Sequence, residues 1–242
     1  MEKTALITGA SRGIGNAIAF AMAKENYNLV LICQKNIDLL EDLKEELCRK
    51  YPIRVMTFCG DVSDYGFWEQ LRDGIREIFP FVDVVINNAG ISYIGLLTEM
   101  SVEDWHKVME TNLSPVFYSA RLFAPAMVRK KQGHIINISS MWGERGASCE
   151  VAYSASKGGM NAFTKALAKE LAPSGVYVNA ISCGVIETDM NKIFSSDERE
   201  MLEEEIPMGR FATPMEVASA VLSLLHSTYI TGQILGVDGG FF

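Results

Sequence analysis

Tyr153 and Lys157 are the two residues of this sequence whose types and spacing are best suited to chemistry. They lie four residues apart in an Ala- and Gly-rich run typical of a helix, and residues at this spacing share one helical face. A phenol with its ordinary pKa of about 10 is a poor acid or base at neutral pH, and a nearby ammonium lowers that pKa. The pair therefore predicts a general acid or base. By chance alone, the same spacing would place a packed Tyr beside a surface Lys.

A hydroxyl group is expected beside this pair. Ser140 ends the apolar run 134–140, which predicts a buried strand. In an open α/β fold, ligands bind at the carboxyl ends of the strands. Ser140 could there donate a hydrogen bond to a carbonyl oxygen while Tyr153 supplies the proton.

Composition restricts the class of protein. The 242 residues are 48% hydrophobic with a formal net charge of −8, which favours one α/β domain over 1–242. The acidic balance argues against nucleic acid or an anionic membrane surface as a partner. No apolar run reaches the roughly 20 residues that span a bilayer, and no signal peptide is expected. Five cysteines without C-x-x-C spacing and three scattered histidines predict a cytoplasmic protein with reduced thiols and no metal site.

A glycine-rich turn follows the first predicted strand, 3–8, and precedes a helical run at 16–25. Glycines let the backbone approach a pyrophosphate, and the N–H groups at a helix start hold its charge. This context predicts a dinucleotide site, although such a turn can also simply join strand to helix. The candidate residues of the turn are Gly9, Ser11, Arg12, Gly13, Ile14 and Gly15.

The end of the second predicted strand, 28–33, concerns the choice of cofactor. An acidic residue there would bind the adenosine 2′-hydroxyl and repel a 2′-phosphate. The sequence has Cys33-Gln34-Lys35 instead. Arg12 and Lys35 can flank a phosphate with positive charge, which predicts NADP(H) in preference to NAD(H). The alternative is that both are solvated surface cations.

Two further strand ends are candidates for the same site. Asp61 and Val62 follow the predicted strand 54–58, and Asp61 could accept a hydrogen bond from the adenine amino group or cap the helix that begins near Asp64. The small and amide residues of 87–90 follow the predicted strand at 82–86. They suit close approach of a cofactor or, alternatively, form an ordinary turn.

Asn112 lies inside the predicted helical stretch 105–127, which Pro115 should disturb. An Asn at such a break can hold a water molecule. The polar, charged segment 187–207 is expected to be a mobile lid over a substrate cleft. Strand and helix patterns alternate along the whole chain, which predicts a Rossmann-type doubly wound, seven-stranded, mainly parallel sheet with right-handed crossovers.

Together these motifs resemble the short-chain dehydrogenase/reductase family over nearly the whole chain. The motifs that carry the resemblance are Thr8-Gly9-x-x-x-Gly13-x-Gly15, Asn87-Asn88-Ala89-Gly90, Asn112, Ser140, Tyr153-x-x-x-Lys157, Asn179 and Gly184. Segments 186–190, 206–210 and 231–240 are most similar to the 3-oxoacyl-acyl-carrier-protein reductases within that family.

The resemblance implies a role for each matching residue. Tyr153 would be the acid or base, Lys157 would lower its pKa and hold the nicotinamide ribose, and Ser140 would orient the substrate carbonyl. Asn112 would hold a water that relays protons, while hydride passes from the nicotinamide to the carbonyl carbon. The resemblance also implies a homotetramer. Besides the turn residues, the cofactor would contact Lys35, Asp61, Val62, Asn88, Ala89, Gly90, Tyr153, Lys157, Gly184, Ile186 and Thr188.

The sequence departs from the family pattern at two positions. Cys183-Gly184 stands where the family usually has Pro-Gly, which should relax the turn that shapes the nicotinamide pocket. Ser174 stands where typical carrier-dependent reductases have an Arg. An acidic carrier protein needs a basic patch, to which the cations of 129–131 could contribute.

The sequence thus predicts an NADPH-dependent carbonyl reductase that converts a 3-oxoacyl thioester, on an acyl carrier protein or CoA, to the 3-hydroxyacyl product. One alternative is a reductase of another ketone or secondary alcohol, such as a steroid, a sugar or a small alcohol. The other is a non-catalytic NADP-binding assembly subunit. The intact set of Asn112, Ser140, Tyr153 and Lys157 argues against that last alternative.

Overall fold

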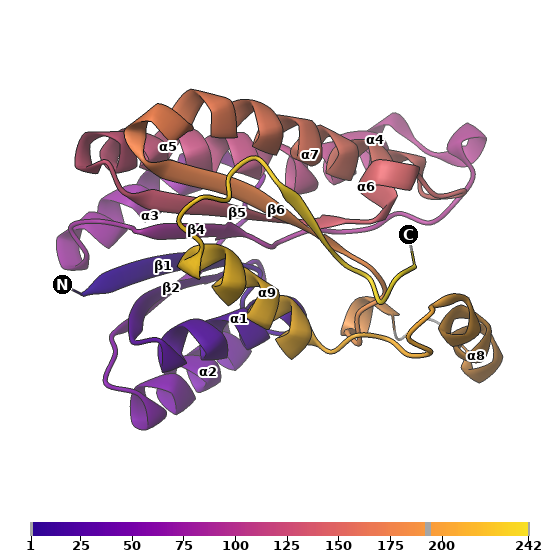
Figure 1. The fold of residues 1–242 in the computed structure, drawn as a ribbon, viewed down its shortest axis with the longest axis horizontal. Helices are drawn as coiled ribbons and strands as arrows, with labels where there is room; N and C mark the ends of the chain where they lie inside the picture. Colours follow the sequence, from indigo (N-terminus) through magenta and orange to yellow (C-terminus); the bar gives the residue numbers. More distant parts are fainter. Residues whose placement is uncertain (1, 192–194, 242) are drawn as a thin grey trace.

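The computed structural model describes residues 2–191 and 195–241, and in this part of the chain seven strands form one parallel sheet (Figure 1). The strands are β1 (Lys3–Thr8), β2 (Tyr27–Cys33), β3 (Val55–Cys59), β4 (Val84–Asn87), β5 (Gly133–Ser140), β6 (Val176–Cys183) and β7 (Ile234–Val237). Their order is β3-β2-β1-β4-β5-β6-β7. The predicted Rossmann-type fold is confirmed, and every predicted strand occurs.

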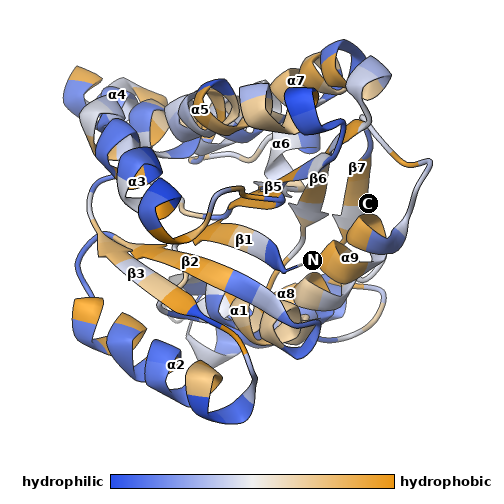
Figure 2. Cartoon of the chain, turned by 90° about the vertical axis from the view of Figure 1, so that its left-hand side faces the viewer, coloured by the Kyte–Doolittle hydropathy of each residue, from blue (hydrophilic) through white to orange (hydrophobic). Residues whose placement is uncertain are grey.

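Helices cover both faces of the sheet (Figures 1 and 2). One face is covered by α1 (Gly13–Lys24), α2 (Ile37–Lys50) and α9 (Pro214–His226). The other face is covered by α3 (Tyr65–Ile78), α4 (Val102–Asn112), α5 (Ser114–Lys130) and α7 (Val151–Leu171), with the short α6 (Trp142–Arg145) before α7. Because both faces are covered, the strands are continuous apolar runs, and the four residues 29–32 of β2 are fully buried.

The chain changes direction across the sheet between β1 and β4, which are neighbours in space. From β1 the chain runs outward to β3 with α1 and α2 on one face. It then returns to β4 and continues to β6 with its helices on the opposite face. The carboxyl ends of β1 and β4 therefore flank the crevice where open α/β sheets bind ligands.

The last crossover corrects the predicted handedness. The connection from β6 through α9 to β7 moves along the sheet in the same direction as the connection from β4 to β5. Its helix, however, packs on the face of α1, whereas α5 packs on the opposite face. This crossover therefore has the opposite hand. The long segment 184–213 permits this arrangement because it carries the chain around the carboxyl edge before α9 begins.

The predicted helical stretch 105–127 is divided into two helices. α4 ends at Asn112 and α5 begins at Ser114, with Pro115 in the first turn of α5. Pro is tolerated there because the first turn of a helix needs no N–H donor. Asn112 is thus the last residue of a helix and is free to serve groups outside it.

The predicted lid contains a short 3-10 turn (Asp189–Asn191) and α8 (Ser196–Glu205), while residues 192–194 of that segment lie outside the described ranges. α8 stands away from the body of the molecule in Figure 1, and none of its side chains is buried. Ser195 and Glu198 form a capping box that starts the helix. α8 is therefore held by its cap and by Arg199, which pairs with Glu187 and lies over the Phe211 ring, rather than by buried side chains of its own.

We predict that Gly15→Ala destabilises the fold, whereas Gly74→Ala in α3 does not. A Cβ at Gly15 would lie 2.2 Å from the carbonyl oxygen of Gly9 and 2.7 Å from Nδ2 of Asn88, so the backbone of the turn must shift. Such overpacking costs about 1–3 kcal/mol. A Cβ at Gly74 meets only Phe58, at an ordinary 3.4 Å. Ala there should stabilise the helix by about 0.5–1 kcal/mol.

Urea unfolding of both variants would measure this difference as a lower midpoint for Gly15→Ala and an equal or higher midpoint for Gly74→Ala. Equal midpoints would contradict the close packing of the glycine-rich turn against the end of β4.

Candidate active site

Three predicted catalytic side chains meet where β5 ends against the first turns of α7. Ser140 is the last residue of β5, and Tyr153 and Lys157 lie one turn apart on α7. Lys157 is buried, with 4% of its surface exposed, and its Nζ donates a hydrogen bond of 2.7 Å to the carbonyl oxygen of Ile138. The same Nζ lies 5.7 Å from the centroid of the Tyr153 ring. The Tyr153 hydroxyl in turn hydrogen-bonds with Ser140.

The electrostatics of Tyr153 correct one expectation. Burial raises the pKa of its phenol above the ordinary value, and the hydrogen bond with Ser140 opposes this only in part. Lys157 does not bring this pKa below the ordinary value in the resting site, where its ammonium is bound to a backbone carbonyl and lies 5.7 Å from the ring centroid. Tyr153 is therefore protonated at neutral pH and can act as a proton donor.

Lys157 is itself perturbed by its surroundings. Burial lowers the pKa of its ammonium to about 8, because a low-polarity environment disfavours the charged form. Cys183 lies close enough to interact electrostatically with both Lys157 and Tyr153. Burial raises the pKa of the Cys183 thiol to about 12, so this thiol is neutral at physiological pH.

Asn112 lies on the other side of Lys157. Its Oδ1 accepts from the N–H of Ile91 at 2.8 Å, and its Nδ2 donates to the carbonyl of Ile91 at 2.9 Å and to Oγ of Ser156 at 3.0 Å. A Cβ at Gly90 would lie 3.2 Å from Asn112 Oδ1 and 3.6 Å from Lys157 Nζ. Asn112 and Lys157 thus lie on two sides of Gly90, which has no side chain to separate them.

A buried polar network supports these residues, and the sequence analysis missed it. Asn87 Nδ2 donates to Asn137 Oδ1, and Asn137 Nδ2 donates to Oγ1 of Thr164, both at 2.8 Å. Ser139 Oγ contacts Oδ1 of Asn161 at 2.6 Å. The available signal was the occurrence of polar residues inside the apolar run 134–140 and on the Lys157 face of α7. The network fixes the height and rotation of α7 against β5.

The predicted phosphate end is formed by two turns that are bonded to each other. Gly9 and Gly13 have φ of +65° and +57°, which is the left-handed region that favours glycine. Asn88 Nδ2 donates to the carbonyls of Thr8 and Gly9 at 2.9 and 3.1 Å. The N–H groups of Asn88 and Ala89 both donate to Oγ1 of Thr8. The glycine-rich turn and the turn after β4 are therefore one unit.

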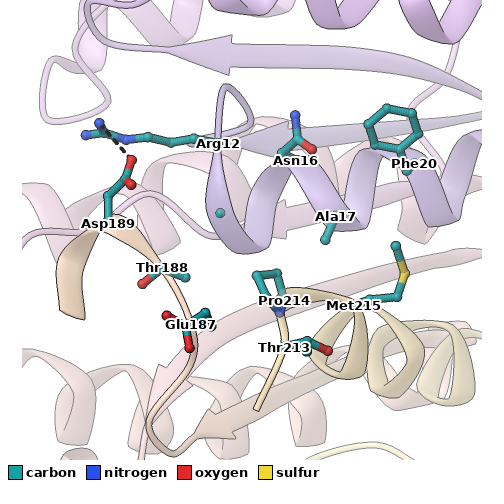
Figure 3. Close-up of a pocket in the computed structure, with 11 residues that line it drawn as sticks. Arg12, Asn16, Ala17, Phe20, Glu187, Thr188, Asp189, Thr213, Pro214 and Met215 are labelled. Carbon is teal, nitrogen blue, oxygen red and sulfur yellow. Dashed lines mark hydrogen bonds and ion pairs between the residues drawn. The ribbon is translucent and has the colours of Figure 1, made fainter. Parts of the chain in front are cut away.

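A pocket of about 490 Å³ opens beside this unit, between the starts of α1 and α9 (Figure 3). Arg12, Gly13 and Thr188 line it, and a Cβ at Gly13 would lie 3.3 Å from the Thr188 methyl. Arg12 forms an ion pair of 3.3 Å with Asp189 at the pocket mouth. Ser11 and Ile14 lie half-buried in the same turn. The catalytic residues lie away from this pocket, at the far end of the predicted cofactor site.

The predicted adenosine end is organised around Asp61. Its Oδ1 accepts from the N–H and the hydroxyl of Ser63 at 2.9 and 2.8 Å, and its Oδ2 accepts from Gln34 Nε2 at 2.8 Å. Burial would raise the pKa of Asp61, but these bonds and the charge of Lys35 lower it below its ordinary value. The alternative capping role is wrong, because Asp64 caps α3 by accepting from the Gly66 N–H.

Three further predicted cofactor contacts, Val62, Gly184 and Ile186, also have close packing partners within the chain. The side chain of Val62 is buried, and its carbonyl accepts from Trp68 Nε1 at 2.8 Å. Ile186 is 3% exposed and belongs to the core beneath α1 and α9. A Cβ at Gly184 would lie 2.7 Å from Cα of Asp238. At the carboxyl end of β6, Cys183 is paired with β5 on one side and with β7 on the other. This pairing holds the end of β6, where the sequence predicted a relaxed turn.

The described ranges, 2–191 and 195–241, contain neither a membrane-spanning helix nor a cluster of metal-ligand side chains. No helix in them combines the length and apolar character needed to cross a membrane. No three His, Cys, Asp or Glu side chains in them gather closely enough to hold a metal ion.

Comparison with known proteins places this geometry in a family. The model of the short chain dehydrogenase family matches residues 3–199. The chain is 41% identical to the uncharacterized oxidoreductase YmfI of Bacillus subtilis (strain 168), over 100% of this chain and 99% of the relative. It is 38% identical to the 3-oxoacyl-(acyl-carrier-protein) reductase FabG of Aquifex aeolicus, over 99% and 97% of the two chains. It is 37% identical to the FabG of Escherichia coli (strain K12), over 99% and 97%.

The match covers the glycine-rich turn, the strand ends and the Tyr153 and Lys157 pair, and the relatives align along nearly their whole length. The fold and the order of its motifs agree with this match. The chain therefore belongs to the short-chain dehydrogenase family of oxidoreductases.

Proposed function

We propose that the protein is an NADPH-dependent carbonyl reductase that converts a 3-oxoacyl thioester to the 3-hydroxyacyl product. The observation that carries this proposal is the meeting of a protonated phenol, a hydroxyl and a buried ammonium at the end of β5. The names of the FabG relatives support the substrate class, since these reductases match over nearly the full chain.

The residues fit a bound nicotinamide dinucleotide. The glycine-rich turn would receive a pyrophosphate at the start of α1, where Gly13 lines the pocket and has no side chain to fill it. Lys157 and Asn112 face each other across Gly90, where Lys157 would hold the nicotinamide ribose and Asn112 a relay water. When bound, the nicotinamide would supply the hydride that reduces the carbonyl carbon.

The chain's own residues would supply orientation and the proton. Ser140 would donate a hydrogen bond to the carbonyl oxygen and hold it beside Tyr153. Tyr153 would then transfer its phenolic proton to that oxygen as negative charge develops there. Lys157 would stabilise the resulting phenolate, because its ammonium lies close to the ring. Each of these steps uses side chains that already lie together at the end of β5.

The position of the basic residues 129–131 affects the choice between an acyl carrier protein and CoA as the carrier of the substrate. Arg129, Lys130 and Lys131 are exposed at the carboxyl end of α5, immediately before β5 begins. Ser140 lies at the opposite end of β5, seven residues from Gly133, or about 23 Å at roughly 3.3 Å per residue. A carrier docked on this patch would be far from the active site of the same subunit. We therefore take the CoA thioester as the substrate to test, with an acyl carrier protein as a second candidate.

We also propose that the subunits assemble as a homotetramer. Exposed apolar side chains lie on helices away from the sheet, including Phe117 of α5 and Val151 of α7, which are 50% and 42% exposed. Ala162 and Ala166 are likewise exposed on the outer face of α7. Light scattering on the purified protein would test the assembly directly, and a monomer at micromolar concentration would contradict it.

The main test is turnover of acetoacetyl-CoA with NADPH and with NADH. NADPH oxidation that depends on the thioester supports the proposal. Turnover of a steroid, sugar or small ketone in place of the thioester would favour the alternative reductase. Tight NADPH binding without oxidation by any ketone of a broad panel would favour the non-catalytic subunit.

Tyr153→Phe should abolish reduction while leaving the cofactor site intact. The substitution removes the proton donor, and general acid catalysis is worth about 10²–10⁴ in rate. We expect kcat to fall by that factor, while the Kd for NADPH, measured by fluorescence titration, changes less than threefold. Turnover close to that of the parent protein would show that another group delivers the proton.

Lys35→Glu should shift cofactor preference towards NADH. The substitution places a carboxylate beside Asp61, where the positive charge of Lys35 now acts. The added negative charge would repel the 2′-phosphate but not a 2′-hydroxyl. We expect the ratio of the Kd values for NADPH and NADH to rise about tenfold, which corresponds to about 1.4 kcal/mol.

The matched control is Lys24→Glu, which makes the same charge change at the far end of α1. It should leave the ratio unchanged. A similar response in both variants would mean that Lys35 acts only through the overall charge.

NADPH binding should weaken above about pH 8. Burial lowers the pKa of Lys157 to about 8, so the free protein loses this ammonium as the pH rises through that value. Tyr153, whose pKa is raised, keeps its proton over the same range. We expect the Kd for NADPH to increase between pH 7.5 and 9.5 in the parent protein. Lys157→Met should bind weakly at every pH without that rise, and a flat profile in the parent protein would exclude a titrating Lys157.

A further inference from the structure

Cys33 and Cys59 lie opposite each other at the carboxyl ends of two adjacent strands. Cys33 ends β2, Cys59 ends β3, and the two are register partners in the parallel ladder. Neighbouring strands are about 4.8 Å apart, which is within the range of roughly 4.4–6.8 Å between Cα atoms that a disulfide allows. The two thiols interact directly. The sequence showed two cysteines far apart, and only the register brings them together.

The two thiols have different surroundings. Cys33 is 3% exposed, and burial together with the neighbouring Cys59 raises the pKa of its thiol to about 11. Cys59 is exposed, and its Sγ donates to the carbonyl oxygen of Gln34 at 3.3 Å. Cys59 is therefore the thiol that a dissolved oxidant reaches first, with Cys33 as its buried partner.

The pair is connected to the predicted adenosine end through its chain neighbours. Gln34 follows Cys33 and donates to Asp61 Oδ2, while the Gly60 N–H after Cys59 donates to the Cys33 carbonyl at 2.9 Å. Lys35 is the next residue along. Any change in the distance between these strand ends moves the groups that would receive the adenosine.

We propose that Cys33 and Cys59 are a dithiol site that a peroxide oxidises to a disulfide, and that this disulfide weakens NADP(H) binding. The effect on binding rests on the proposed cofactor function. The sulfur of Cys59 attacks one oxygen of hydrogen peroxide, which gives a sulfenic acid and one water. The sulfur of Cys33 then displaces the hydroxyl from Cys59, which forms the disulfide and a second water. Two thiols thus lose two electrons and two protons, and one peroxide is reduced to two waters.

The disulfide changes the adenosine end in two ways. It removes the S–H of Cys59, so the carbonyl of Gln34 loses its donor. It also brings the two sulfurs to a bonding distance of about 2.05 Å, which we expect to turn Cys33 and Cys59 and to shift the neighbouring Gln34 and Lys35 relative to Asp61. Both changes affect adenosine binding and leave Tyr153 and Lys157 in place.

The test uses the full chain, with Cys48→Ser as the matched control because Cys48 is an exposed thiol on α2 away from this site. Reduced protein is treated with a small excess of hydrogen peroxide. Peptides are then mapped without reductant, and the Kd for NADPH is measured before and after dithiothreitol.

We expect a peptide linked through residues 33 and 59, with a rise in the Kd of about fivefold or more that dithiothreitol reverses. The Cys48→Ser protein should respond in the same way, whereas Cys59→Ser should give no linked peptide and no change in the Kd. Absence of the linked peptide in the parent protein would overturn the proposal, and so would a linked peptide with an unchanged Kd. Failure of the proposed function would be visible separately, as reduced protein that binds neither NADPH nor NADH.

Discussion

The hydrogen bond from the buried Lys157 ammonium to the carbonyl of Ile138 is the interaction on which the site depends. An ammonium out of water is costly unless a partner compensates for the lost hydration, and burial lowers the pKa of Lys157 to about 8 with this hydrogen bond in place. A hydrophobic residue would make a more stable core at this position. The retained charge is therefore understandable as a functional group, which α7 holds at the end of β5 where the phenol of Tyr153 lies.

The same burial also sets the resting protonation state of Tyr153. A phenol whose pKa is raised keeps its proton at neutral pH and is by itself a weak acid. Transfer of its proton therefore needs a neighbour that stabilises the phenolate. As negative charge forms on the phenol, the adjacent ammonium becomes a favourable neighbour, and its effect is greatest when the proton leaves. The pair thus stabilises the product of proton transfer more than the resting state, which is how a residue assists a reaction.

The sequence alone was sufficient for the fold class and for bringing Ser140, Tyr153 and Lys157 together, because both are encoded in local patterns. The spacing of Tyr153 and Lys157 places them on one helical face, and Ser140 ends an apolar run whose strand end is the ligand edge. The partner of Lys157 was not predictable, because no spacing rule says that its ammonium binds the backbone of β5. The pairing of Cys33 with Cys59 depends on a register between strands 26 residues apart in sequence, which hydrophobic pattern does not specify. The hand of the last crossover likewise depends on how segment 184–213 passes around the sheet.

The two ends of the site are held by forces of different strength. The catalytic end is fixed by the buried bonds of Asn112, Lys157 and the polar network behind them. At the phosphate end, Arg12 reaches Asp189 of the lid segment through an ion pair whose side chains are 61% and 41% exposed, and such pairs contribute only about 0–1 kcal/mol. α8 has no buried side chain, and it is attached through Arg199, which pairs with Glu187 and lies 4.5 Å from the centroid of the Phe211 ring. A phosphate that competes for Arg12 would therefore give up little ion-pair energy, while the reacting groups keep their positions. Reacting groups fixed by buried bonds beside a segment attached at the surface suit a site that a ligand must enter and leave.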